Sequence, residues 1–425
     1  MEQRYTVSAD GCPVPLIPAQ VWEKKGQAEP IPHTMYLACI EHDFRTPLTL
    51  RVRHTGGGEA EVRPHALGLQ PVRQGEEDVL TLTSPAKLSL EYGGKLYENL
   101  FVFALQPDAQ RPDPAAPGVR YFGPGEHHPG EIRLSSGETL YLDAGATVYG
   151  RVCAKGAEHI TVAGHGILHG GEENHDTDRK YHMFFEDCRD VTVRDVLMCD
   201  SPAWSFVTMR CRGVTAEGLR QVSYNWNSDG FDICGSEDVT IDGAFIRNFD
   251  DNISLKSFGG HCRNITMKNS VLWCDCAHNM LVGPEADREQ GTVFENILFE
   301  NIDVLESREY CETYMGVMAI MCADRARIRN VCWRNIRVER LSHGKLVQIR
   351  YVTAYAKELG RSVEDIRFER ITAELPERPV ITIAGADAGR TVQRVTFDGL
   401  QADPVWDLAA FTGPVVCNGT AVSCG

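Results

Sequence analysis

A short β-rich phrase recurs nine times between residue 159 and the C-terminal end, and this repeat limits the folds that the chain can adopt. Each copy alternates polar with aliphatic residues, as in DVTVRDVLMCD (190–200) and DVTIDGAFIRN (238–248). Neighbouring copies are 23 to 35 residues apart, counted between equivalent hydrophobic positions. These positions are Ile160, Val191, Val214, Val239, Ile265, Ile297, Val331, Ile366 and Val395. Self-similarity at such a period is typical of solenoids, in which each repeat packs only on its neighbours.

A second short strand precedes most copies of the phrase, for example FVTMRC (206–211) and FDICGS (231–236). Two or three strands per repeat, without an intervening helix, predict an all-β fold: a right-handed parallel β-helix over residues 119–425. Leucine-rich repeats need a recurring LxxLxLxxN phrase, which the sequence lacks. Propeller blades need four strands in about 40 residues, and the shortest repeats are too short for that.

The first part of the chain has a different sequence pattern. Strand-like alternation appears in LTLRVRH (48–54), DVLTLTS (78–84), AKLSLEY (86–92) and NLFVFAL (99–105), with glycine-rich turns between them. This pattern predicts a small β-sandwich. QPDAQRPDPAAPG (106–118) contains four prolines and no periodicity, so it is the expected linker. The predicted domains are therefore residues 1–118, a sandwich with its linker, and residues 119–425, the β-helix.

Composition narrows the classes of function. The formal net charge of −16 argues against a nucleic-acid partner, because phosphate binding needs a basic surface. The sequence has no apolar run of about 18 residues, so no membrane span is expected. Fifteen cysteines, an odd number, with no secretory signal at the start, indicate reduced thiols and a cytoplasmic location. Association into homo-oligomers is left open.

The cysteines fit the repeat. Cys188, Cys211 and Cys234 are each 23 residues apart, which predicts a ladder of small buried side chains. The alternation around Cys234 differs from that around Cys211, so the ladder is expected to slip there. Cys274, Cys276 and His278 form a CxCxH phrase, but no fourth ligand with matching spacing follows, and no metal site is assigned.

Three successive repeats concentrate acidic residues. Aligning GFDICGS, DNISLKS and HNMLVGP by their inward hydrophobic residues places Asp229, Asp251 and His278 at one position of three stacked coils, with Asp250 beside Asp251. Stacked strands lie about 4.8 Å apart, so three carboxylates and an imidazole are expected in one patch. Like charges this close raise at least one pKa, which keeps a carboxyl group protonated as a general acid. Single aspartates here could be turn residues, but their coincidence in register favours catalysis.

These residues also carry a family resemblance. NSDGFDI (227–233), DDNISLKS (250–257) and AHNMLVG (277–283) resemble the NTDG, DD and GHG motifs of the polygalacturonase-type enzymes, glycoside hydrolase family 28. The resemblance covers about residues 120–340, and a sandwich before a β-helix is also similar to the dextranase and isopullulanase enzymes. It implies that Asp250 is the general acid, that Asp229 and Asp251 hold and deprotonate the attacking water, and that His278 supports the acid and the sugar.

The resemblance implies an inverting glycoside hydrolase without a cofactor or metal, acting on a carbohydrate substrate. We expect it to be polygalacturonase-like and to attack short fragments from one end. Alternative hypotheses are a neutral α-glucan hydrolase of the dextranase type, a pectate-lyase-like elimination enzyme, which would need an arginine base that is not found beside the aspartates, and a non-catalytic sugar-binding β-helix.

The sequence departs from the family pattern in the next coil. Pectin-cleaving members carry the motif RIK there, whose cations bind the galacturonate carboxylate, and the aligned Met318 and Ile320 are apolar. Lys256 and Arg350 are the expected substitutes. Trp226, three residues before Asp229, is the first choice for stacking on a sugar face. Asn227 and Asn279 complete the expected substrate-binding set.

Overall fold

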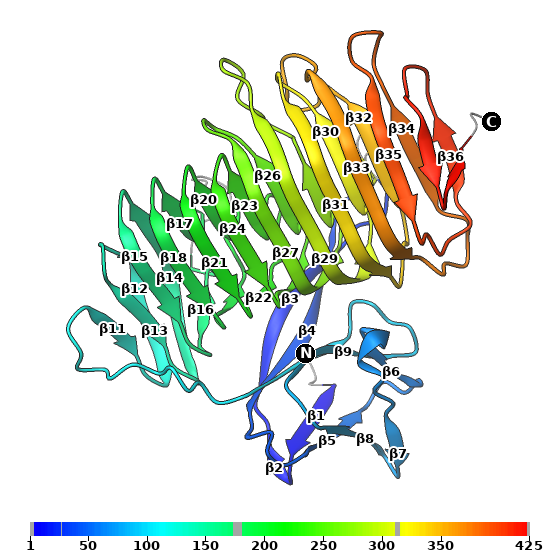
Figure 1. Cartoon of the computed structure of the whole chain (residues 1–425). Helices are drawn as coiled ribbons and strands as arrows, with labels where there is room; N and C mark the ends of the chain where they lie inside the picture. The colour runs from blue at the N-terminus through cyan, green and yellow to red at the C-terminus, as the bar shows by residue number, and fades with distance from the viewer. Residues whose placement is uncertain (1–3, 27, 173–180, 311–314, 423–425) are drawn as a thin grey trace. The chain divides into compact units, whose positions relative to one another are not determined.

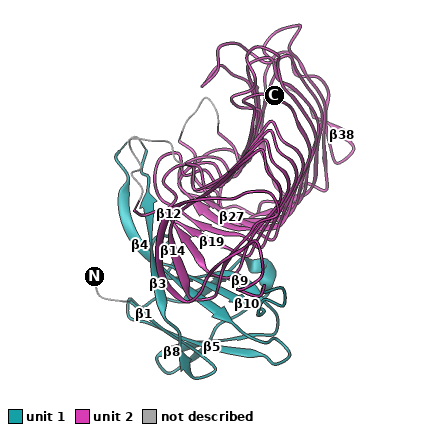
Figure 2. Ribbon diagram, turned by 90° about the vertical axis from the view of Figure 1, so that its left-hand side faces the viewer, with its two compact units in different colours: residues 1–111 teal, residues 112–425 magenta. Residues whose placement is uncertain are grey.

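A computed structural model describes residues 4–26, 28–172, 181–310 and 315–422. The chain divides into two compact units, residues 1–111 and 112–425, coloured separately in Figure 2. The division falls inside the proline-rich segment 106–118. No helix in the described parts of the chain has the length and apolarity needed to cross a lipid bilayer.

The first unit consists of two five-stranded sheets, with one short 3-10 helix, η1 (His65–Leu67). One sheet has the order β2 (Cys12–Pro13), β1 (Tyr5–Ala9), β5 (Leu48–His54), β8 (Glu77–Leu82), β7 (Val72–Gln74). The other has the order β3 (Leu16–Glu23), β4 (Ile31–Glu41), β10 (Leu100–Leu105), β9 (Ala86–Tyr92), β6 (Ala60–Arg63). Alternate residues of both sheets, such as Leu50, Leu80, Leu90 and Val102, form one buried core. The expected sandwich-like pair of sheets is confirmed.

The second unit is a parallel β-helix, seen in Figure 1 as stacked coils from β11 to β38. Its strands form three ladders that run the length of the solenoid. The site ladder, on which the acidic residues lie, consists of β17 (Met183–Glu186), β20 (Phe206–Met209), β23 (Phe231–Cys234), β26 (Ile253–Lys256), β28 (Met280–Val282), β30 (Met318–Cys322), β32 (Val347–Tyr351), β34 (Val380–Ala384) and β36 (Val405–Leu408).

The second ladder carries the repeated phrase. It consists of β11 (Val119–Phe122), β13 (Thr139–Leu142), β15 (Glu158–Ala163), β18 (Arg189–Arg194), β21 (Arg212–Glu217), β24 (Glu237–Asp242), β27 (Cys262–Cys274), β29 (Val293–Ser307), β31 (Arg327–Val338), β33 (Ser362–Thr372), β35 (Val392–Asp398) and β37 (Val415–Cys417), and β38 (Thr420–Ala421) pairs antiparallel with β37. The third ladder consists of β12 (Gly125–Arg133), β14 (Ala146–Lys155), β16 (Ile167–His169), β19 (Leu197–Cys199), β22 (Arg220–Val222) and β25 (Phe245–Asn248), and it continues into the second halves of β27 to β33.

The hydrophobic pattern sets the register. All nine equivalent positions predicted from the repeat, from Ile160 to Val395, are paired in unbroken succession on the second ladder. Their side chains are buried in one continuous core. The prediction of a parallel β-helix is therefore confirmed residue by residue. A one-residue slip would turn each of these side chains outward, so the core selects this register.

Asparagines mark one corner of the coils. Asn264, Asn296 and Asn330 all have positive φ, a conformation that Asn tolerates better than most residues. The side-chain amide of Asn296 donates to Asn264 (3.1 Å), and that of Asn330 donates to Asn296 (2.7 Å). The same residue type thus turns the chain and links successive coils.

The cysteines follow the expected pattern. Every cysteine in the described residues is a free thiol. Cys188 and Cys211 are neighbours, since the Cys188 amide donates to the Cys211 sulfur at 3.4 Å. The next residue of this row is Ser236, whose hydroxyl accepts the Cys211 amide, whereas Cys234 pairs with Met209. The ladder therefore slips at Cys234, as predicted.

Candidate active site

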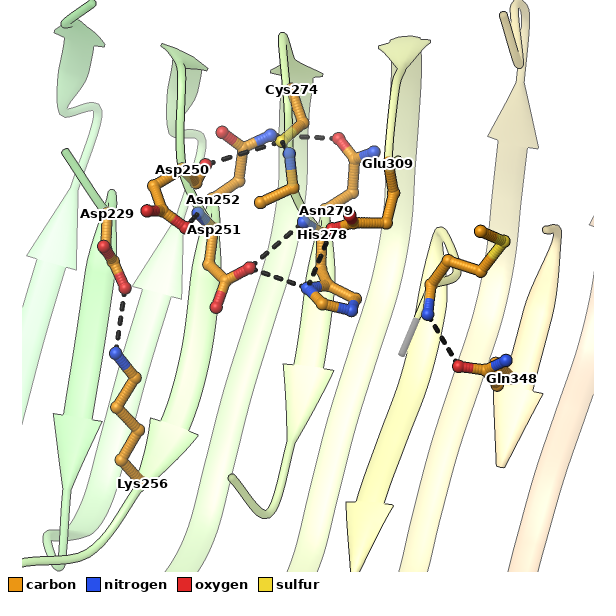
Figure 3. A network of polar contacts seen from close by, with 12 residues as sticks. Asp229, Asp250, Asp251, Asn252, Lys256, Cys274, His278, Asn279, Glu309 and Gln348 are labelled. Atoms are coloured by element: carbon orange, nitrogen blue, oxygen red, sulfur yellow. Dashed lines mark hydrogen bonds and ion pairs between the residues drawn. The ribbon is translucent and has the colours of Figure 1, made fainter. Parts of the chain in front are cut away.

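The register of the site ladder brings three predicted catalytic residues into one row. Phe231 pairs with Ile253, so Asp229 lies beside Asp251, and the amide of Asn252 donates to the His278 carbonyl at 2.9 Å. Each of the three residues stands just before a strand, β23, β26 or β28. Figure 3 shows Asp229, Asp250, Asp251 and His278 gathered at this edge. The row expected from the hydrophobic alignment is the row that the structure contains.

The three aspartates form a tight group. One carboxylate oxygen from each of Asp229, Asp250 and Asp251 lies within 4.8 Å of the others. Asp229 and Asp251 are buried and Asp250 is half-buried. Asp250 accepts the amides of Asn227 and Asp251, both at 3.0 Å. The left-handed backbone of Asn227 (φ 58°) turns its amide toward this carboxylate.

The environment separates the pKa values of the adjacent aspartates. Burial, together with the charge of Asp251, raises the pKa of Asp250. Burial alone would also raise the pKa of Asp251, but the charge and hydrogen bond of His278 outweigh it and lower that pKa. The Asp250 carboxyl is therefore shifted toward its protonated form, and the neighbouring Asp251 carboxyl toward its ionised form. Paired groups with opposite shifts are the arrangement that general acid–base chemistry requires.

His278 is held between two carboxylates. Its Nδ1 lies 2.8 Å from Asp251 Oδ1 and 3.7 Å from Glu309 Oε2, and its side chain is almost fully buried. Burial disfavours the imidazolium, but the charges of Asp251, Glu309 and Asp250 outweigh it and raise the pKa of His278 to about 9. His278 is therefore positively charged at neutral pH. Its positive charge offsets part of the negative charge of the neighbouring carboxylates.

Lys256 is the second cation of the cluster. Its Nζ donates to Asp229 Oδ2 at 2.9 Å and lies 2.7 Å from Asp232 Oδ1 and 3.4 Å from Glu285 Oε2. Burial, followed by the charge of Asp232, raises the pKa of Asp229 well above its usual range, against the effect of Lys256. Burial also raises the pKa of Asp232 to about 7. The carboxylates outnumber the cations here, so not all of them can be ionised together.

Sequence reasoning missed Asp232, Glu285 and Glu309. Asp232 carries a weak signal, because it stands between the inward residues Phe231 and Ile233 and must point outward on the site ladder. Glu309 follows β29, in the loop that corresponds to the one carrying His278. The repeat does not constrain the conformation of these loops, so no pattern in the sequence indicated that Glu309 approaches the imidazole.

The predicted substrate ligands occupy different environments. Trp226 is 47% exposed, and its ring meets Phe249 edge-on at 4.8 Å, so an accessible ring lies beside the aspartates. Asn227 is exposed. Arg350 is half-buried and pairs in register with Met321 on the site ladder.

Asn279 is a correction. Its side chain is fully buried. Its Oδ1 accepts a hydrogen bond from the side-chain amide of Asn252 at 2.9 Å, and its own side-chain amide donates to the Glu306 carbonyl at 3.5 Å. It links coils and leaves no surface for a sugar. The expected alignment of the RIK motif also needs correction, because Met318 and Ile320 belong to the interior core. The outward positions of β30 are Ala319 and Met321, which are also apolar, so β30 presents no cation.

The side chains of the CxCxH phrase do not point toward a common centre. The Cys274 thiol donates to the Asp250 carbonyl at 3.4 Å and accepts the Ala277 amide at 3.1 Å, while His278 faces Asp251. Cys274 therefore supports the turns that carry Asp250, Asp251 and His278. Within the described ranges, the aspartate trio is the one group of His, Cys, Asp or Glu side chains with the spacing of metal ligands.

Side chains stand on both sides of the aspartates along the solenoid. On the N-terminal side, Trp204 stacks between Tyr181 (5.0 Å) and Phe258 (6.0 Å). On the C-terminal side, Leu281, Ala319 and Met321 form a small apolar cluster with Val352 and Ala354 packed against it. Along the site ladder, the acidic cluster is therefore flanked by an aromatic stack, of which Phe258 is exposed, and by a buried apolar cluster.

Sequence comparison identifies a family. The pattern of glycosyl hydrolases family 28 matches residues 148–405, more than half of the chain. Endopolygalacturonase B of Aspergillus niger is 30% identical over 167 residues, which are 38% of this chain and 42% of that protein. The match thus spans less than half the length of this curated relative.

Solved structures share the fold. Dex49A from Penicillium minioluteum has a TM-score of 0.58 and 14% identity, covering 96% of this chain and 94% of its own. A hyperthermoactive exopolygalacturonase from Thermotoga maritima has a TM-score of 0.50 and 14% identity, covering 72% of this chain and 85% of its own. At such identities the likeness establishes the architecture alone.

Proposed function

The chain belongs to glycosyl hydrolases family 28, and from that premise we propose that it hydrolyses a glycosidic bond with inversion at the anomeric carbon. The observation that carries this proposal is the grouping of Asp229, Asp250 and Asp251 within 4.8 Å, in which the pKa of Asp250 is raised and that of Asp251 is lowered. A single-displacement hydrolysis needs one protonated and one ionised carboxyl around the scissile bond.

The roles follow from the protonation states. Asp250 gives its proton to the departing glycosidic oxygen as the bond to the anomeric carbon breaks. Asp251, with Asp229 beside it, orients a water and takes its proton as the water oxygen attacks that carbon. Positively charged His278 holds Asp251 in its ionised form through the 2.8 Å contact. No cofactor takes part in this scheme.

The closeness of the aspartates needs a comment. Acid and base are usually about 6.5–9.5 Å apart in inverting enzymes and about 5 Å apart in retaining ones, and here oxygens of all three residues lie within 4.8 Å. We favour inversion because two carboxylates share the water, so the rule for a single pair does not apply directly. The configuration of the first product distinguishes the two outcomes.

We further propose that the enzyme removes sugars from the end of a short chain. The name of one solved structure with the same fold, an exopolygalacturonase from Thermotoga maritima, supports this proposal. Exposed Trp226 is the proposed stacking surface for a sugar ring.

A polygalacturonase-like substrate is the first candidate, in line with the names of the relatives. Arg350, in register with Met321, is the proposed partner for a uronate carboxylate. A neutral α-glucan is the second candidate. The lack of a cation on β30 favours it, because the outward positions of this strand are the apolar residues Ala319 and Met321.

The decisive experiment is a hydrolysis screen over galacturonan, rhamnogalacturonan and α-glucan oligosaccharides of defined length. Product anomers are followed by proton NMR, and wild type is compared with Asp250→Asn and Arg350→Ala. We expect monosaccharide release with inverted configuration, loss of activity in Asp250→Asn, and a raised KM in Arg350→Ala for uronates only. Initial formation of the retained anomer would contradict the mechanism. Sugar binding without any cleavage would favour a non-catalytic β-helix.

A further inference from the structure

Lys256 is enclosed by protein groups on every side that the structure describes. It is the last residue of β26, and its side chain is about 5% exposed. Its ammonium contacts Asp229 (2.9 Å), Asp232 (2.7 Å) and Glu285 (3.4 Å). It also lies 3.8 Å from the ring centre of Trp204. An ammonium has three N–H donors, and three carboxylates already surround them.

These contacts argue against a direct role in sugar binding. A sugar hydroxyl or carboxylate would have to displace one of the three carboxylates, and a displaced Asp229 or Asp232 would be left buried without its cation. Removing one partner of a buried ion pair is strongly destabilising, because it leaves an uncompensated buried charge. A single hydrogen bond to a sugar does not offset that cost. The geometry therefore turns Lys256 toward the catalytic carboxylate and away from the substrate.

We propose that Lys256 is a positioning residue for the reaction: its ammonium orients Asp229 and keeps that carboxylate able to accept a proton, while Asp232 holds Lys256 in place. The inference rests on the proposed function, in which Asp229 shares the attacking water. Asp229 is 3% exposed and lies within 4.8 Å of Asp250 and Asp251. Burial raises the pKa of Asp229 even beside Lys256, and without this cation the pKa would rise further, so the carboxyl would be less available as a base.

The charged groups around this pair set the sign of each effect. Three groups face Lys256 from β23 and the turn before it: the carboxyl groups of Asp229 and Asp232 and the buried thiol of Cys234. Two further carboxyl groups, those of Asp250 and Asp251, lie in the turn before β26. Glu285 approaches from the loop after β28. His278 reaches Asp251 on the far side. Lys256 is the one cation within 4 Å of Asp229 in the described residues, so its loss must raise the pKa of Asp229, and loss of the Asp232 charge must lower it.

The test measures kcat/KM against pH for wild type, Lys256→Met and Asp232→Asn. We expect the acid limb of Lys256→Met to move to higher pH by about 1 to 3 units, the usual effect of an adjacent opposite charge. The limb of Asp232→Asn should move to lower pH. Lys268→Met and Asp242→Asn, which remove a half-buried pair (3.2 Å) on the second ladder, should leave the profile unchanged. A raised KM in Lys256→Met with an unmoved acid limb would overturn the proposal and make Lys256 a sugar ligand.

Two further measurements keep the test independent of folding and of the proposed function. If Lys256→Met does not fold, the double variant Lys256→Met/Asp232→Asn is compared with Asp232→Asn, and equal acid limbs would refute the role of Lys256. The carboxyl titration of Asp229, followed by carbon-13 NMR and assigned with Asp229→Asn, should shift upward in Lys256→Met. This shift is expected even if wild type cleaves none of the glycosides, a result that would contradict the proposed function alone.

Discussion

The Nδ1 atom of His278 lies 2.8 Å from Oδ1 of Asp251, and the backbone amide of His278 donates to the same oxygen at 3.1 Å. The two residues occupy equivalent positions on successive coils, so the stacking of parallel strands creates the contact. The pair is buried, and each partner shifts the other toward its charged form: the pKa of His278 rises to about 9 and that of Asp251 falls. The pair therefore separates the pKa of Asp251, which is lowered, from that of the neighbouring Asp250, which is raised.

The shift of His278 predicts a pH-dependent stability. The pKa of His278 is raised from its ordinary 6.5 to about 9 in the folded protein, so proton binding stabilises the fold. The contribution is complete below about pH 6.5 and is lost as the pH rises through 9, a total of about 3 kcal/mol. Urea unfolding at pH 6 and pH 9.5 should show this loss in wild type and a smaller loss in His278→Gln. Equal losses in both proteins would contradict the assignment, and exposed His159→Gln is the control.

Replacing Asp250, the proposed general acid, should lower the rate of hydrolysis by a factor that depends on the leaving group. Asp250→Asn keeps the shape but has no proton to give, so kcat should fall about 10²- to 10⁴-fold on natural oligosaccharides. Aryl glycosides with an acidic phenol need little protonation, and their cleavage should be much less affected. Steady-state rates on both substrate types provide the measurement. An equal loss on both would argue that Asp250 acts otherwise, and Asp242→Asn on the second ladder serves as the matched control.

The aspartate trio predicts independence from divalent cations. Three carboxylate oxygens within 4.8 Å could hold an ion, but the Lys256 ammonium and the His278 imidazolium already contact Asp229 and Asp251. We expect dialysis against EDTA, followed by assay with and without added Ca²⁺, to leave hydrolysis unchanged. Activity that disappears with EDTA and returns with Ca²⁺ or Mg²⁺ would assign the cluster to a metal instead.

The interior aromatic stack predicts where the solenoid is most sensitive. Phe368 is buried between Trp333, with ring centres 5.0 Å apart, and Phe397, at 4.4 Å. Phe368→Ala leaves a cavity in the centre of the stack and should reduce the free energy of unfolding by about 3 to 5 kcal/mol. Phe411→Ala, at a ring that is 46% exposed, should have a much smaller effect. Calorimetry of the two variants compares them directly, and similar melting temperatures would argue against the stack as a source of stability.

Several features of the site were predictable and others were not. The row of Asp229, Asp251 and His278 followed from the inward residues of three strands, because the core admits only one register. Met318 and Ile320 were aligned with the two cations of the RIK motif although both lie in the core, where a sugar carboxylate cannot reach them. Asn279 was assigned to the sugar although it bonds between coils, because the sequence does not show which side of a turn faces inward.

The sequence alone determined the parallel β-helix and the position of the row formed by Asp229, Asp251 and His278. In a parallel stack, residues at equivalent positions of successive repeats lie next to one another. The hydrophobic repeat is therefore sufficient to place residues that are distant in the sequence side by side. The tertiary structure decided the charge states. Glu309 approaches His278 and Glu285 approaches Lys256 through loops whose lengths vary from coil to coil, while Asp232 reaches Lys256 from β23. A pKa depends on every charge within a few ångströms, and the two glutamates come from segments on which the repeat imposes no pattern.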